Sequence, residues 1–269
     1  MSGAPDLPAA LADFGAAQLA AVIIAVYLVV GEPFVGYVLH RRFEGRLRTD
    51  PAARRSFYRR LLVLEWGLAL VALVVWLAAP EVSAAEVGLR WPTGWPGVGT
   101  WLAVVVLGLL VLLTTRALRG GAVAGPPPET LRRTRPGEAR HAEPPGHSTL
   151  ALLPRSRSER RLFALVGVTA GVCEEWLYRG FFLAVVAAVA PGMPALVLVL
   201  VAALAFGVAH AYQGLPGVVT TGVLGGVLAG VYLDTGSLLL PVLLHAAIDL
   251  RFLFVPSSAL PAAETSERA

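Results

Sequence analysis

Residues 162–190 read LFALVGVTAGVCEEWLYRGFFLAVVAAVA, an apolar stretch interrupted near its middle by the charged group Glu174–Arg179. A helix that crosses a membrane needs about 20 apolar residues. The stretch therefore predicts either one long tilted helix or two helices broken near the charged group. Ionisable side chains cost about 2.5–3.5 kcal/mol each inside a membrane on insertion scales, so their presence here points to function.

The same apolar character recurs along the chain, which is 56% hydrophobic and only 15% charged. A soluble domain usually carries about 25% charged residues. We find neither strand-like alternation nor an internal repeat. The sequence therefore predicts an all-α, polytopic integral membrane protein with seven or eight transmembrane helices. Besides Leu162–Ala190, the predicted spans are Ala16–Leu39, Leu61–Ala79, Val98–Leu118, Met193–Ala211, Leu215–Leu233 and Ser237–Val255.

Arginines in the connecting segments predict the orientation. Residues 41–60 and 119–161 are rich in arginine, whereas Pro80–Gly97 holds only Arg90 and the first residues hold none. The positive-inside rule places both basic segments in the cytosol and the N-terminus outside. We expect the plasma membrane of a bacterium, and anionic lipid rather than nucleic acid as the partner of the basic segments.

Proline divides the chain into two halves. Residues 119–161 contain Pro126-Pro127-Pro128, a composition that resists regular structure. We therefore expect four regions: a three-helix membrane segment (1–118), a basic cytosolic linker (119–161), a helical core with the polar groups (162–255) and a C-terminal tail (256–269).

Helical geometry separates the two adjacent glutamates. Glu175 and Arg179 are four residues apart and share a face, so they can form an ion pair that supports the helix. Glu174 points about 100° away and has no local partner. The glutamates of the first two spans, Glu32 and Glu65, are expected to be structural or interfacial.

Two histidines lie in the later spans. His245 and Asp249 are four residues apart and share a face, and His210 ends the fifth span. Three helices can thus aim Glu174, His210 and the His245/Asp249 pair at one buried point. Buried histidines and ion pairs also pin helices together, which is the structural alternative.

A carboxylate and an imidazole together can hold a water molecule and remove its proton. A second imidazole can donate a hydrogen bond to the oxyanion that forms when this water attacks an amide. The sequence has no His-Glu-x-x-His zinc motif and no Gly-x-Ser-x-Gly turn. No cofactor is predicted, although a zinc site from Glu174, His210 and His245 is chemically possible.

Three motifs in order resemble a known family. Glu174–Arg179 has the pattern Glu-Glu-x-x-x-Arg, Phe206–His210 has Phe-x-x-x-His, and His245–Asp249 has His-x-x-x-Asn with Asp in place of Asn. This combination is similar to the CPBP family, the CAAX protease and bacteriocin-processing group also called Abi. The resemblance covers roughly Leu162–Phe254.

The resemblance implies an intramembrane glutamic endopeptidase whose site opens toward the cytosolic leaflet. It implies that Glu174 and His210 activate water and that His245 and Asp249 line the oxyanion site. Eukaryotic members trim prenylated proteins, and bacterial members are associated with peptide maturation and bacteriocin immunity. The implied substrate is a membrane-associated peptide or protein. The residues implied to support the site are Glu175, Arg179 and Phe206.

Asp249 departs from the family pattern, and two roles for it are open. A protonated carboxyl group would donate a hydrogen bond as the asparagine amide does, whereas an ionised one would orient His245 and hold it charged. Two other functions also compete with the enzyme: a non-catalytic scaffold or immunity protein of the same fold, and a transporter that uses these groups as a proton relay.

Overall fold

The computed structural model describes residues 15–46, 50–120, 152–257 and 260, and within them every regular element is helical. The predicted all-α class is therefore confirmed for this part of the chain. The α-helices are α2 (Ala16–Val26), α3 (Glu32–Arg46), α4 (Ala53–Leu77), α5 (Val98–Arg119), α8 (Arg157–Glu175), α9 (Phe182–Val189), α10 (Ala195–Ala209), α11 (Gly214–Thr235) and α12 (Leu239–Leu250).

Short non-α turns join or end several of these helices. Tyr27–Gly31 and Trp176–Phe181 are π-helical and link α2 to α3 and α8 to α9 without a break. The sequence predicted either one long helix or two broken helices over Leu162–Ala190. The structure has one continuous helix, with a wider turn after Glu175. The 3₁₀ turns Ala211–Gln213 and Arg251–Phe254 follow α10 and α12.

Four helices are long and apolar enough to cross a membrane: Ala16–Arg46, Ala53–Leu77, Val98–Arg119 and Ala211–Thr235. Their outward faces carry exposed apolar side chains such as Ile23, Val74 and Leu102, which suits a lipid environment. The count of seven or eight spans stays a prediction, as does the orientation. Most of the basic linker, the first residues and most of the C-terminal tail lie outside the described residues.

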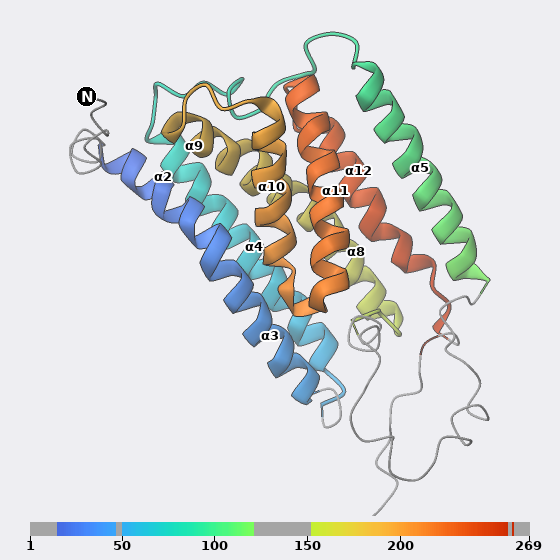
Figure 1. Ribbon diagram of the computed structural model, residues 1–269. Helices are drawn as coiled ribbons and strands as arrows, with labels where there is room; N and C mark the ends of the chain where they lie inside the picture. Colours follow the sequence, from blue (N-terminus) through green and yellow to red (C-terminus); the bar gives the residue numbers. More distant parts are fainter. Residues whose placement is uncertain (1–14, 47–49, 121–151, 258–259, 261–269) are drawn as a thin grey trace, which may run out of the picture.

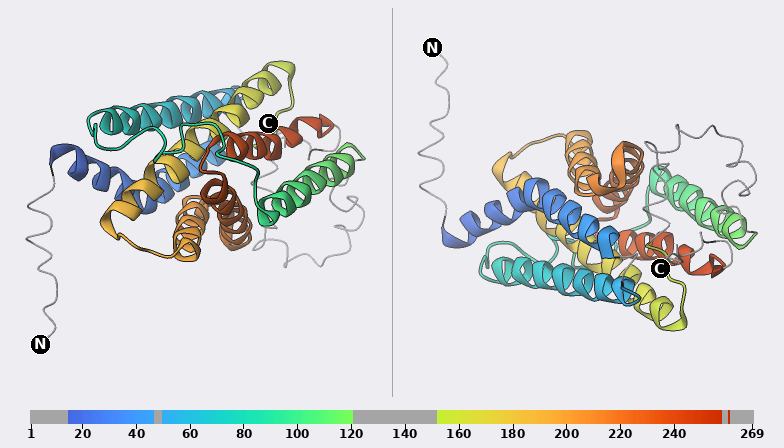
Figure 2. Two further views of the ribbon diagram at one scale, coloured as in Figure 1. Left: turned by 90° about the horizontal axis from the view of Figure 1, so that it is seen from above. Right: turned by 90° about the horizontal axis from the view of Figure 1, so that it is seen from below.

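The continuous helix α8–α9 runs through the middle of the bundle, with α4 on one side and the α10–α11 pair on the other (Figures 1 and 2). Helix α12 packs against α8, and α3 packs against α10 and the 3₁₀ turn after it. Helix α5 lies at the edge, against α11 and α12. The first two helical runs thus belong to the same bundle as the later ones.

Glycines allow two pairs of helices to approach closely. A Cβ atom on Gly207 of α10 would lie 2.7 Å from the carbonyl oxygen of Val218 in α11. A Cβ atom on Gly171 of α8 would lie 3.1 Å from the carbonyl oxygen of Val242 in α12. Small residues at such contacts let helix backbones pack tightly. Both contacts lie within one turn of a motif residue, so they set the spacing of the site.

The start of α12 is anchored by the connection between α4 and α5. The backbone N–H of Leu238 donates to the Gly88 carbonyl (3.0 Å), and Ser237 Oγ donates to the Arg90 carbonyl (2.6 Å). Asp234, in the last turn of α11, accepts hydrogen bonds from Gly97 N and from the hydroxyl of Thr100. These contacts fix the end of α12 that leads to His245.

Candidate active site

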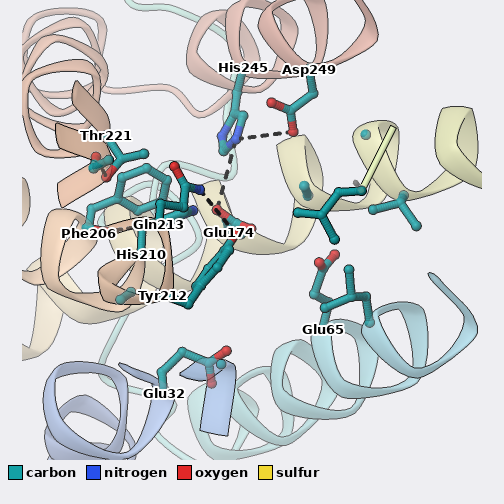
Figure 3. Close-up of a pocket in the computed structure, with 18 of the residues that line it drawn as sticks. Glu32, Glu65, Glu174, Phe206, His210, Tyr212, Gln213, Thr221, His245 and Asp249 are labelled. Atoms are coloured by element: carbon teal, nitrogen blue, oxygen red, sulfur yellow. Dashed lines mark hydrogen bonds and ion pairs between the residues drawn. The ribbon is translucent and has the colours of Figure 1, made fainter. Parts of the chain in front are cut away.

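A cavity of about 730 Å³ opens between α3, α4, α8, α10, α11 and α12. Its wall includes the side chains that the sequence aims at one point, and the close-up in Figure 3 draws them around a common space. Helical spacing thus brings together residues that lie far apart in the chain. The motif residues on this wall are Glu174, Phe206, His210, His245 and Asp249.

Behind the wall, Glu175 and Arg179 form the ion pair expected from their spacing. Arg179 Nη1 donates to Glu175 Oε1 at 2.9 Å, and both side chains are 0% exposed. Arg179 also donates to the Gly225 carbonyl at 3.1 Å, and its guanidinium carbon lies 4.4 Å from the centre of the Phe206 ring. The arginine thus ties α8–α9 to α10 and α11.

His245 makes a contact that the sequence reasoning missed. Its Nδ1 lies 2.7 Å from Glu175 Oε1, so Glu175 contacts α12 as well as its own helix. The other ring nitrogen, Nε2, lies 3.9 Å from Glu174 Oε2 and 3.8 Å from Asp249 Oδ2. A role for Glu175 limited to its own helix is therefore incomplete. The i,i+4 rule finds partners within one helix only, and this partner lies on another.

His210 caps the C-terminal end of α10, where the helix gives way to a 3₁₀ turn. Its Nδ1 lies 2.8 Å from the Phe206 carbonyl oxygen. A carbonyl oxygen only accepts hydrogen bonds, so Nδ1 is the protonated nitrogen and Nε2 of the neutral ring is an acceptor. The ring packs against Phe206 and Tyr212, which holds its orientation.

Glu174 is the less constrained of the adjacent glutamates. Its side chain is 20% exposed, and its Oε2 has no hydrogen-bond partner. Glu175, by contrast, is fully buried in its ion pair. The two glutamates thus point in different directions, as their helical positions predict: Glu174 faces the cavity and Glu175 faces Arg179.

Two further carboxylates lie across the cavity. Glu32 of α3 and Glu65 of α4 both line it and are drawn opposite Glu174 in Figure 3. Glu65 Oε2 is buried without a hydrogen-bond partner. The sequence predicts both to be structural or interfacial, and it offers no sign of which helix faces α8. The only available signal was a lone carboxylate inside an apolar stretch.

The sequence also left open a metal site formed by Glu174, His210 and His245. Within the described residues, no group of three or more His, Cys, Asp and Glu side chains is arranged to hold a metal ion. Glu174, His210 and His245 therefore share a cavity wall without forming such a group.

Residues 157–251 match the family model described as type II CAAX prenyl endopeptidase Rce1-like. This part of the chain is therefore similar to that family. No curated protein and no solved structure matches the chain. This match confirms the resemblance inferred from the three motifs.

The matched segment begins at the first residue of α8 and ends just after α12. It contains Glu174, His210, His245 and Asp249. Helices α3 and α4, which supply Glu32 and Glu65, precede it. One wall of the cavity thus comes from outside the matched domain.

Proposed function

We propose that this protein is an intramembrane endopeptidase that hydrolyses a peptide bond in a membrane-associated peptide or protein. The proposal rests on one observation: two histidines line the same cavity, and each is held by a different kind of hydrogen-bond partner. His210 is held through a backbone carbonyl, and His245 is held through the carboxylate of Glu175. The match to the family model supports the reaction type.

The anchoring suits the two histidines to opposite tasks. With Nδ1 protonated, His210 presents an unprotonated Nε2, which can accept a proton. Together with the carboxylate of Glu174 it would remove a proton from water as the oxygen attacks the peptide carbonyl carbon. His245, with a carboxylate at Nδ1, would donate Nε2–H to the developing oxyanion.

The reaction would then proceed through a tetrahedral intermediate. When the C–N bond breaks, the proton taken from water passes from Glu174 or His210 to the departing amine. The products are a new carboxylate and a new amine, and no covalent enzyme intermediate forms. Asp249 would add a second donor to the oxyanion if its carboxyl group is protonated.

Release of a C-terminal tripeptide from a farnesylated CAAX peptide tests the proposal. The purified protein in lipid vesicles is incubated with the peptide, and products are identified by mass spectrometry. Glu174→Gln and His210→Ala should each lower turnover by at least about 10²-fold, the usual scale of a general base. Glu86→Gln, in the α4–α5 connection, is the matched control for the first change.

Comparative peptidomics extends the test to native substrates. Membranes containing the wild-type protein should yield cleavage products that membranes with Glu174→Gln lack. The alternative function is a non-catalytic scaffold or immunity protein of the same fold. That alternative would be established if both membranes yield identical peptides and if the Glu174→Gln variant still gives full immunity to a bacteriocin.

A further inference from the structure

One oxygen of Glu175 serves two helices. Oε1 accepts a hydrogen bond from Arg179 Nη1 at 2.9 Å and lies 2.7 Å from His245 Nδ1. The side chains of Glu175 and Arg179 are 0% exposed, and that of His245 is 9% exposed. The ion pair on α8–α9 therefore continues into the imidazole that faces the cavity.

The contact fixes which nitrogen of His245 carries a proton. Glu175 Oε1 already accepts a hydrogen bond in the ion pair with Arg179, and a carboxylate in an ion pair only accepts hydrogen bonds. Nδ1 must therefore donate. Nε2 is left to face the cavity, with Glu174 Oε2 at 3.9 Å and Asp249 Oδ2 at 3.8 Å (Figure 3).

The surroundings of Nε2 also bear on the charge of the ring. In a neutral ring with Nδ1 protonated, Nε2 is an acceptor that faces two further acid groups. A ring protonated at both nitrogens instead presents Nε2–H toward them. The carboxylate at Nδ1 stabilises the positive charge of that form, as in catalytic triads where a buried carboxylate orients a histidine.

We propose that Glu175 is a positioning residue of the active site: through His245 it sets the Nδ1–H form and sustains the charged ring that donates to the oxyanion. This inference rests on the proposed function. Because Glu175 already supplies the counter-charge of His245, Asp249 does not need to be ionised. Asp249 can then act as a neutral donor.

A double-mutant cycle separates this role from simple helix pinning. Glu175→Gln keeps the size of the side chain and an oxygen that can accept from Nδ1, but it removes the charge. It should lower kcat by at least about 10-fold, the lower end of the loss seen when a group that orients a metal-binding histidine is removed, with KM little changed. In a His245→Ala background the same change should alter kcat by less than about twofold.

Equal losses in both backgrounds would mean that Glu175 acts on the fold and not through His245, and would overturn the proposal. The kinetics use the farnesylated CAAX peptide under single-turnover conditions, with folded protein quantified by size-exclusion chromatography. A wild-type protein that cleaves neither this peptide nor native membrane peptides refutes the proposed function itself.

A second readout needs no substrate. In protein labelled with ¹⁵N-histidine, the His245 signals are identified by their loss in His245→Gln. The wild type should show a strongly hydrogen-bonded Nδ1–H on His245, and Glu175→Ala should abolish that signal while leaving the Nδ1–H of His210 in place. A wild-type His245 protonated only at Nε2 would refute the positioning role whatever the activity.

Discussion

The two adjacent glutamates should differ sharply in their effect on stability. Glu175→Ala leaves Arg179 buried, with the Gly225 carbonyl at 3.1 Å and the Phe206 ring at 4.4 Å but without its ion-pair partner. Removing one partner of a buried ion pair costs about 3–5 kcal/mol. For a chain of this size each kcal/mol corresponds to roughly 2–4 °C in Tm, so the expected loss is about 10 °C.

Glu174→Ala removes much less. Its Oε2 has no hydrogen bond, and its nearest ionic contact is His245 Nε2 at 3.9 Å. We expect a change within about 1 kcal/mol, as for substitutions that break no buried network. The assay is thermal unfolding in one detergent, followed for both variants and the wild type.

The decisive control removes both partners of the ion pair. Glu175→Ala combined with Arg179→Leu should recover part of the stability lost in the single variant, because a buried pair can be replaced by apolar groups at little cost. If Glu174→Ala is the more destabilising change, or if the double variant is no more stable than Glu175→Ala, the assignment of ion pair and free carboxylate is wrong.

Three further predictions concern the site, the helix packing and the topology. Asp249→Asn should keep activity within about threefold and flatten its decline at high pH, because an amide donates at any pH and a carboxyl group only when protonated; a pH–rate profile with a folded but inactive variant would rule this out. Gly207→Ala should lower Tm and activity, since its Cβ would lie 2.7 Å from a backbone oxygen, whereas Gly230→Ala, which meets nothing within 4 Å, should do neither. In a cysteine-free background, a cysteine at Glu86 should react with an impermeant reagent from outside intact cells and one at Arg135 should not.

The helices could be predicted because lipid imposes a simple rule on sequence. Each apolar stretch named from the sequence corresponds to a helical run, and Leu162–Ala190 is continuous in the structure. The i,i+4 spacing also identified the Glu175–Arg179 pair. Both inferences depend on local geometry, which a sequence specifies directly.

Contacts between helices were not readable in the same way. The hydrogen bond from His245 to Glu175 depends on the rotation of α12 about its axis and on its close approach to Gly171. The place of Glu65 on the cavity wall depends on which face of α4 meets α8. Neither rotation leaves a periodic signature when both faces of a helix are apolar, because lipid and protein interior favour the same side chains.

The π-helical turn Trp176–Phe181 has a consequence for how this chain can change in length. A π turn holds one residue more than an α turn and is found frequently at functional sites. Deleting a single residue there would let the helix close as an ordinary α-helix, still unbroken. The turn would then cover the same angle with one residue fewer, so the helix beyond it would keep its direction relative to Glu174. Loss of one residue in this turn would therefore spare both the helix and the direction of its second half, whereas loss of one residue within the α-helical part of α8 would rotate one part of the helix by about 100° relative to the other.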